Sequence, residues 1–165
     1  MGKLESNSLV AYGRGKNLKA MYCPGEMVGV LYGEVTEKLG LGPALHKAGT
    51  TMGLSSYGTP FDFNYQSYND DIKYKMDVAA SVQNLFENRV LNVLDDIDQQ
   101  SDNLCLSGGS FLNCNANSEV VRKSKFKHFH HFPACGDDGT SVGSALYAAH
   151  HILGEARYNY DVKDL

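Results

Sequence analysis

A glycine-rich turn between a short apolar run and a helical pattern occurs twice in the last third of this chain. The apolar run 104–106 leads into the turn 107–109, and the run 129–133 leads into the turn 136–139. Glycine lets the backbone approach a ligand closely, and the free N–H groups of a first helical turn attract anions. The repeated order of strand, turn and helix predicts an α/β layer with partly parallel strands and a phosphate site at the turns.

The first turn offers bare backbone to a ligand. Gly108 and Gly109 carry no Cβ, so a ribose or a phosphate can lie directly against the main chain. Ser107 precedes them, and Asn113 follows about one helical turn after Gly109, where its amide could hydrogen-bond to the same ligand. A tight strand-to-helix connection, in which glycine serves packing only, explains these residues equally well.

The second turn carries two carboxylates, Asp137 and Asp138, at the expected start of a helix. Aspartate at a helix start is commonly a cap, worth about 1 kcal/mol. In the alternative interpretation, one carboxylate binds a divalent cation that also contacts phosphate oxygens. A single aspartate cannot hold such an ion, so the other ligands would come from elsewhere in the chain, from water or from another polypeptide.

The cysteines and histidines allow a second metal hypothesis. Cys135 could form a zinc site with His128, His130 or His131. On a strand, however, His128 and His130 point to one face and His131 to the other, so surface histidines are the simpler interpretation. The four cysteines include no C-x-x-C pair, which favours reduced thiols in a cytoplasmic protein.

Composition excludes several classes of function. The chain has 165 residues, enough for one domain, and its apolar content of 42% is ordinary. With a net charge of −4 and a single basic cluster at 122–127, we expect no nucleic-acid partner. No apolar run reaches the ~20 residues that span a bilayer, and the N-terminus lacks a hydrophobic segment suited to a signal peptide, so we expect no membrane association.

The first part of the chain predicts a hairpin and a helix. Residues 8–12 and 18–23 read as strands joined by a turn at 13–17. An apolar stripe at helical spacing begins after Glu26 and ends at Gly40 and Gly42.

The middle of the chain is less regular. The glycine- and serine-rich stretch 46–60 predicts an ordered loop, and the aromatic stretch 61–74 predicts either a strand or a lid. Residues 76–98 predict the longest helix, with Asp77 favouring its start and acidic residues opposing the dipole at its end.

Five segments, in order, resemble one known family. Residues 104–117 (LCLSGGSFLNCNAN) and 133–146 (PACGDDGTSVGSAL) are similar to the nucleotide-binding segment and the following proline–aspartate–glycine motif of the NodU/CmcH-type carbamoyltransferases. These are nodulation and antibiotic O-carbamoylation enzymes. The similarity continues upstream in 29–40, 52–58 and 77–83, so it covers roughly residues 26–150.

The resemblance implies an α/β fold, namely one RNase H-like lobe of the actin-like ATPase (sugar kinase-like) fold, with a mixed sheet flanked by helices. Residues 1–156 would form this nucleotide-binding lobe, and 157–165 a polar C-terminal tail. Only the second of the two lobes would be present, because the family's metal-binding histidine-x-x-x-histidine pair has no counterpart in this sequence.

The resemblance also implies a chemistry. Family members make carbamoyl adenylate from carbamoyl phosphate and ATP, and transfer the carbamoyl group to an acceptor hydroxyl. By position, Ser107, Gly108, Gly109 and Asn113 would contact the nucleotide, and Asp137 would bind a divalent metal (Fe, Mn or Mg).

The departures from the family leave other functions open. Gly49 and Thr50 stand where the family usually has glycine and lysine, so a basic side chain near the phosphates is missing. No catalytic residue is assigned, and we expect the chain alone to be nearly inactive, with a companion lobe or a second copy as partner. The alternatives are a non-catalytic assembly module of the same fold that self-associates and, less favoured, a related sugar or acid kinase.

Overall fold

The part of the chain that the computed structural model describes, residues 8–22, 28–62, 69–98 and 100–157, contains both helices and strands. This confirms the α/β class. The elements are β1 (Val10–Arg14), β2 (Asn17–Tyr22), α1 (Val28–Lys38), α2 (Ala44–Ser55), α3 (Ile72–Asp96), β3 (Asn103–Leu106), the 3-10 turn η1 (Gly109–Leu112), α4 (Cys114–Lys123), β4 (His128–His131), the 3-10 turn η2 (Asp137–Gly139), α5 (Thr140–Tyr147) and the π-helical turn η3 (Ala148–Ile152).

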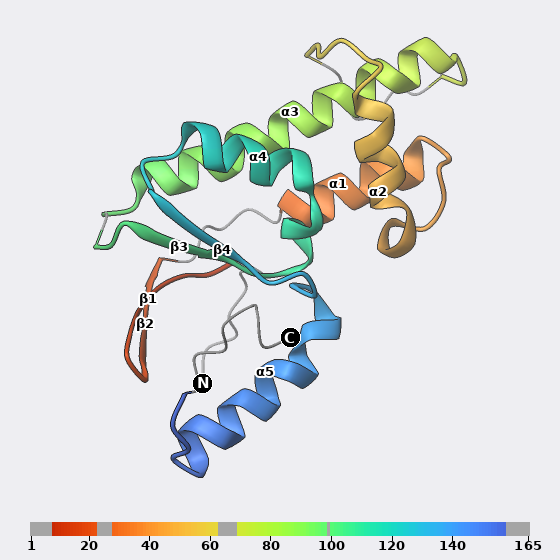
Figure 1. Ribbon diagram of the computed structural model, residues 1–165. Helices are drawn as coiled ribbons and strands as arrows, with labels where there is room; N and C mark the ends of the chain where they lie inside the picture. The colour runs from red at the N-terminus through yellow and green to blue at the C-terminus, as the bar shows by residue number, and fades with distance from the viewer. Residues whose placement is uncertain (1–7, 23–27, 63–68, 99, 158–165) are drawn as a thin grey trace, which may run out of the picture.

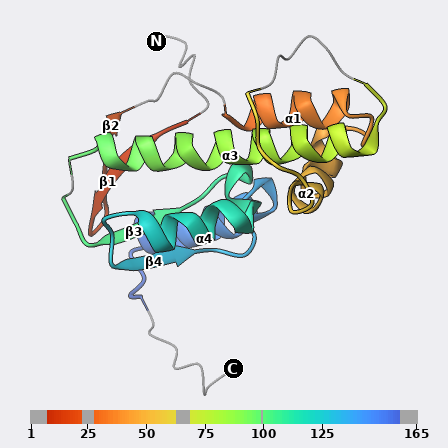
Figure 2. The ribbon, with the colours of Figure 1, turned by 90° about the horizontal axis from the view of Figure 1, so that it is seen from above.

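Helix α3 is the element against which most others pack. Helices α1, α2 and α4 all contact it. Figure 2 shows α1 and α2 grouped at the N-terminal end of α3, with α4 beside its other half. The β3–β4 pair lies below α3 and α4, and α5 lies on the other side of that pair (Figure 1).

The strands form two separate pairs among the described residues, where a single mixed sheet was expected. β1 and β2 pair antiparallel, as the hairpin pattern predicted, and Gly15 takes a positive φ of 61° in the turn. β3 and β4 pair parallel, which confirms the prediction from the doubled strand–turn–helix order. β3 and β4 have four residues each and offer few ladder hydrogen bonds. Packing against α3 and α4 therefore holds this pair.

Helix α1 ends as its glycines predicted. Gly40 has a φ of 71°, and its N–H donates to the carbonyl of Glu37, while the N–H of Leu41 donates to the carbonyl of Thr36. This paired arrangement satisfies two carbonyls at the helix end, and it requires the left-handed conformation that glycine adopts without strain.

The prediction of a loop at 46–60 was wrong for its first part, because α2 occupies Ala44–Ser55. Glycine, threonine and serine have low helix propensity, so local sequence does not favour this helix. Tertiary packing stabilises it: the Thr51 side chain is fully buried, and a Cβ on Gly33 of α1 would lie only 2.8 Å from the Cβ of Ala44.

Helix α3 begins four residues earlier than predicted. Its N-cap is Asp71, whose carboxylate accepts the N–H of Tyr74 at 2.9 Å. Asp77, predicted to favour the helix start, instead lies in the second turn. There it accepts the N–H of Thr59 at 2.7 Å and pairs with Lys73, so it anchors the loop after α2 to α3.

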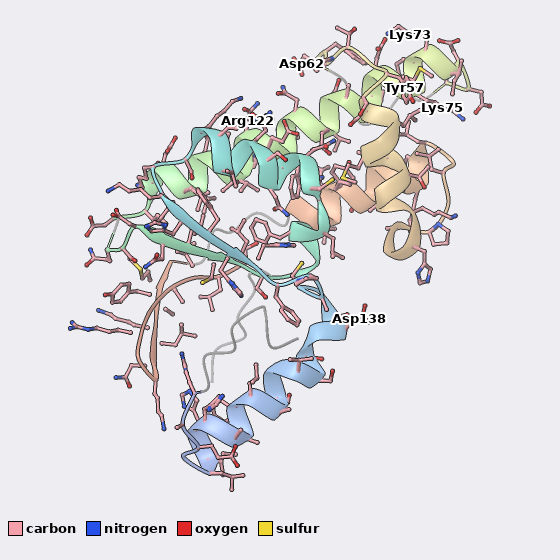
Figure 3. All side chains as sticks on the ribbon, in the orientation of Figure 1. Tyr57, Asp62, Lys73, Lys75, Arg122 and Asp138 are labelled. Carbon is pink, nitrogen blue, oxygen red and sulfur yellow. The ribbon has the colours of Figure 1, made fainter. Side chains whose placement is uncertain are left out.

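The same loop is anchored at two further points. Ser81 accepts the N–H of Phe61 at 2.8 Å, and a Cβ on Gly58 would lie 2.0 Å from the carbonyl oxygen of Met76. Tyr57, Asp62 and Lys73 accordingly gather around the start of α3 (Figure 3). The segments 52–58 and 77–83, found separately in the sequence, therefore form one contact.

Two buried clusters lie along α3. The first joins α1 and α3 around Val35, Val78 and Phe86, and the second joins the end of α3 to β3 and α4 around Leu94, Leu106 and Val120. The two clusters share the partly buried Val90. Helix α3 thus connects the helical part of the molecule to the strands that carry the glycine turns.

Some predictions fall outside the described residues. These include Cys23, residues 63–68 of the expected strand or lid, and residues 158–165 of the expected polar tail. In the described part of the chain, no helix combines the length and apolar character needed to cross a bilayer.

A buried hydroxyl pair between α1 and α2 yields a stability prediction. The hydroxyl of Thr36 donates to the carbonyl of Tyr32 at 2.8 Å, so it must accept from Thr51, whose hydroxyl lies 2.8 Å away. Thr36→Val removes both bonds and orphans the Thr51 hydroxyl, while Thr51→Val removes one. We expect losses in the free energy of unfolding of about 2 and about 1 kcal/mol respectively, measured by urea denaturation. The exposed neighbour Thr50, replaced by Val, is the control and should change little; a larger loss for Thr51→Val than for Thr36→Val would contradict the assignment of donor and acceptor.

Asp77 yields a pH prediction. The ammonium of Lys73, followed by the N–H of Thr59, lowers the pKa of the Asp77 carboxyl below its ordinary value. A lowered folded-state pKa stabilises the fold above the unfolded-state pKa of about 4, and this contribution is lost as the pH falls through the folded-state value. Asp77→Asn should therefore be less stable than the wild type near neutral pH, and the difference should shrink below about pH 4. Urea denaturation across this range measures it, and a difference that stays constant with pH would refute the ionic contribution.

Candidate functional site

The two glycine turns lie side by side at the carboxyl ends of β3 and β4. The N–H of Gly108 donates to the carbonyl of Cys135 at 2.7 Å, and the Cys135 thiol lies 3.4 Å from the carbonyl oxygen of Gly108. A Cβ on Gly136 would lie 3.7 Å from the Cα of Gly109. The carboxyl ends of neighbouring parallel strands meet at one edge, and this is why turns that are separate in the sequence come together.

Some of these positions require glycine, whereas others have room for a side chain. Gly108 has a φ of 108°, which side chains other than glycine rarely adopt, and a Cβ on Gly139 would lie 1.9 Å from the carbonyl oxygen of Ala134. Around Gly109, in contrast, no atom lies within 4 Å of an added Cβ. The space above Gly109 is therefore open, and the absence of a side chain there is not explained by packing within the described residues.

The start of α1 also reaches this region, which the sequence reasoning missed. A Cβ on Gly29 would lie 2.8 Å from the Oγ of Ser110, so α1 and η1 approach closely at this point. The signal available in the sequence was a glycine in the first turn of an apolar helix, and this has several common explanations. Only the tertiary structure shows that its neighbour is the turn after β3.

Asn113, predicted to face the nucleotide, is engaged within the protein. It is the N-cap of α4, and its Oδ1 accepts the N–H of Ala116 at 3.0 Å. Its amide also pairs with that of Gln83 on α3: Asn113 Nδ2 donates to Gln83 Oε1 at 2.9 Å, and Gln83 Nε2 donates to Asn113 Oδ1 at 3.1 Å. The sequence placed Asn113 near the turn but did not reveal Gln83 as its partner.

The pair extends to α1 through a buried tyrosine. The hydroxyl of Tyr32 donates to Gln83 Oε1 at 2.8 Å, and Gln83 Nε2 donates to Glu87 at 2.7 Å. Burial, followed by the negative charge of Glu87, raises the pKa of the Tyr32 phenol above its ordinary value. Tyr32 therefore remains a protonated donor throughout the physiological range.

Asp137 and Asp138 lie at the junction between β4 and α5, and both are exposed; Figure 3 marks Asp138 there. Their carbonyls accept the hydroxyls of Thr140 at 2.6 Å and of Ser141 at 3.2 Å. Among the residues that the structure describes, no three histidine, cysteine, aspartate or glutamate side chains are placed to hold a metal ion. Asp137 can thus supply one metal ligand, but the described chain does not form a complete site.

The zinc alternative finds no support in the described part of the chain. The Cys135 thiol is buried against the carbonyl of Gly108, and His131 Nε2 lies 2.7 Å from the carbonyl oxygen of Phe111. Strand β4 has exposed histidines, as the simpler interpretation predicted. These side chains do not gather into a metal-binding group.

The basic cluster at 122–127 is used within the protein. Arg122 and Lys123 pair with Glu119, and Lys127 pairs with Asp102. Lys125 donates to the carbonyls of residues 95 and 97 at the end of α3, where it offsets the acidic residues that oppose the helix dipole. This cluster is a helix end bearing intramolecular ion pairs.

An open groove of about 680 Å³ adjoins the first turn. It lies along η1, α4 and the end of β4, and Phe111, Leu112, Val121 and Pro133 give it largely apolar walls. The predicted site thus combines the two glycine turns with a neighbouring apolar groove.

Comparison with known proteins identifies the family. Residues 61–146, just over half of the chain, match the family model described as carbamoyltransferase N-terminus. The uncharacterized protein sll1178 of Synechocystis is 41% identical over 85 residues, which is 50% of this chain and 14% of that protein. The uncharacterized protein MJ1058 of Methanocaldococcus jannaschii is 24% identical over 158 residues, covering 76% of this chain and 26% of that protein.

This chain therefore spans about a seventh to a quarter of the curated relatives that it matches. The matched region contains α3, both glycine turns and most of α5. The chain belongs to the carbamoyltransferase N-terminal family.

Proposed function

We propose that this chain is a nucleotide-binding lobe of a carbamoyltransferase of the NodU/CmcH type, with the actin-like ATPase fold. The observation that carries the proposal is the meeting of two glycine turns at the carboxyl ends of parallel strands, with open space above Gly109. Ligands of open α/β sheets bind at this edge, and backbone N–H groups there suit phosphate oxygens.

The proposed reaction needs a nucleotide to activate a poor electrophile. Carbamoyl phosphate, ATP and water give carbamoyl adenylate, pyrophosphate and inorganic phosphate, and the carbamoyl group then passes from the adenylate to an acceptor hydroxyl with release of AMP. In this scheme the main chain at Ser107, Gly108 and Gly109 binds the nucleotide, and Asn113 lies at its edge. A closed site would keep water away from the adenylate.

The described residues supply only part of a metal site. Asp137 supplies one exposed carboxylate, and the described residues offer no complete set of ligands. A divalent ion (Fe, Mn or Mg) would need further ligands from the remainder of a longer protein, since the relatives are much longer than this chain. We therefore expect nucleotide binding by this chain alone, and turnover to pyrophosphate no higher than background.

Gly109 provides the sharpest test of nucleotide binding. Wild-type protein with millimolar ATP and Mg²⁺ should melt at a higher temperature than without ligand, because a ligand that binds only the folded state stabilises it. Gly109→Val places a side chain in open space, so it should fold with a melting temperature near that of the wild type. It should nevertheless lose the ATP-induced shift, because the side chain occupies the proposed nucleotide position.

Two controls accompany this thermal-shift experiment. Gly53→Val on α2 also meets open space, and α2 packs against α1 and α3, so this variant should keep the ATP-induced shift. Asp137→Ala should keep the shift with ATP alone and lose any additional shift from the metal. No response of the wild type to ATP, or an unchanged response in Gly109→Val, would defeat the proposed function.

Helix α5 favours a second candidate, the non-catalytic assembly module. Its apolar side chains are exposed, including Val142, Leu146 and Tyr147 at 42%, 53% and 58%, and Ile152 follows at 70%. Contiguous exposed apolar surface marks an interaction site. A second copy of this chain could cover it across a two-fold axis.

Sedimentation velocity separates this candidate from the first. If α5 mediates assembly, the chain should sediment as a dimer, and Leu146→Glu should convert it to a monomer. Tyr57→Glu changes an exposed aromatic residue in the loop after α2, near the start of α3, and should leave the dimer intact. A monomeric wild type at high micromolar concentration would eliminate self-association through α5.

A further inference from the structure

The thiol of Cys114 meets the thioether of Met52. The Cys114 Sγ lies 3.8 Å from the Met52 Sδ, and the two residues are 62 positions apart in the sequence. Cys114 is the first residue of α4, and Met52 lies on α2. The contact therefore brings together two sulfur atoms from different helices, and the proposed nucleotide site makes no use of it.

Helix α3 holds the two sulfur atoms at this separation. Helices α2 and α4 both pack against α3, so the position of neither sulfur depends on a loop. Cys114 is exposed and lines the open groove of about 680 Å³ beside the first turn, whereas Met52 is partly buried. The pair is thus carried by regular elements and is still reached from solvent, as a binding site requires.

The separation of the two sulfur atoms suits two ligands of one metal ion. With a metal–sulfur bond of about 2.3 Å, two sulfur ligands lie about 3.8 Å apart at a tetrahedral angle and about 4.6 Å apart on a straight line. The observed 3.8 Å between Cys114 Sγ and Met52 Sδ falls at the lower end of this range. An ion therefore fits between the two atoms with little movement of either helix.

The chemistry of the two atoms selects the kind of ion. Thiolate and thioether sulfur are soft, polarisable ligands that favour Cu(I). A structural Zn²⁺ takes four ligands, and in the described part of the chain no three histidine, cysteine, aspartate or glutamate side chains gather to supply them. The Oδ1 of Asn115, which lies 3.9 Å from Cys114 Sγ, is a hard ligand and does not alter the preference for a soft ion.

We propose that Cys114 and Met52 form a binding site for a soft monovalent cation, Cu(I). On binding, the Cys114 thiol releases its proton to solvent and its sulfur bonds to the ion as a thiolate, while Met52 Sδ donates a lone pair. No electron is transferred, and the bound ion links α2 to α4. This inference goes beyond the proposed function and does not rest on it.

The experiment measures Cu(I) binding to the full chain without oxygen, in competition with the chromophoric chelator bicinchoninate. Loss of an outer-shell partner of a metal ligand costs roughly 10–100-fold in affinity, so loss of a ligand should cost about tenfold or more. We expect this loss for Cys114→Ser and for Met52→Leu, which keeps the side-chain volume. Two control variants should keep the wild-type affinity: Met76→Leu changes another partly buried methionine, and Cys105→Ser removes another exposed thiol.

Two further measurements locate the bound ion. With one equivalent of Cu(I), the Cys114 thiol should be protected from iodoacetamide while the exposed Cys105 thiol still reacts, as mass spectrometry of the peptides shows. The X-ray absorption spectrum at the copper edge should contain two sulfur ligands for the wild type and one for Met52→Leu.

Each result decides the proposal. A wild type that does not compete for Cu(I), protection of a different cysteine, or an unchanged affinity in Met52→Leu overturns it and leaves the sulfur contact as packing between helices. If Met52→Leu does not fold, the copper-edge spectrum of the wild type decides, and a single sulfur ligand there overturns the proposal. The thermal response to ATP is measured without copper, so failure of the proposed function is distinguished from failure of this site.

Discussion

The parallel pairing of β3 with β4 is the constraint on which the candidate site depends. The register pairs Leu106 with His131, so the two strands end together and lead into their turns at the same edge of the pair. The Gly108–Cys135 hydrogen bond then joins one turn to the other. The pair is short, and the burial of Leu106 and Phe126 against Val120 of α4 and Leu94 of α3 keeps it in place. Hydrophobic packing at this end of α3 thus sets the geometry of the polar turns.

The buried amides of Gln83 and Asn113 connect the second half of the molecule to the first. Apolar contacts along α3 hold the layers together, but they do not specify the rotation of a side chain. The hydrogen bond from Gln83 Nε2 to Glu87 does, because a carboxylate can only accept, so the other end of the amide, which receives the Tyr32 hydroxyl, is the oxygen. A single buried network therefore relates α1, α3 and the start of α4, and α1 and α4 also contact the 3-10 turn η1 that follows the first glycine turn.

Much of the local structure was predictable because it rests on local rules. The helical stripe ending at Gly40 and the hairpin turn at Gly15 were read correctly, since both depend on glycine at a positive φ. The segment that forms α2 was misread, because its glycines, threonines and serines lack helix propensity and the burial of Thr51 stabilises it instead. Asp77 was misread as a helix start, because tertiary contacts decide its role. Its partner, the N–H of Thr59, belongs to a loop that reaches α3 only in the folded protein.

The sequence by itself determined the α/β class, the parallel order of the last two strands, and the presence of two glycine turns, because periodicity and glycine positions act over a few residues. Only the tertiary structure decided that Gly108 touches Cys135, that Gly29 approaches Ser110, and that Gln83 pairs with Asn113. These contacts join residues between 27 and 81 positions apart, since 135 − 108 is 27 and 110 − 29 is 81. Such pairs are selected by the packing of whole helices against α3, which no short stretch of sequence encodes.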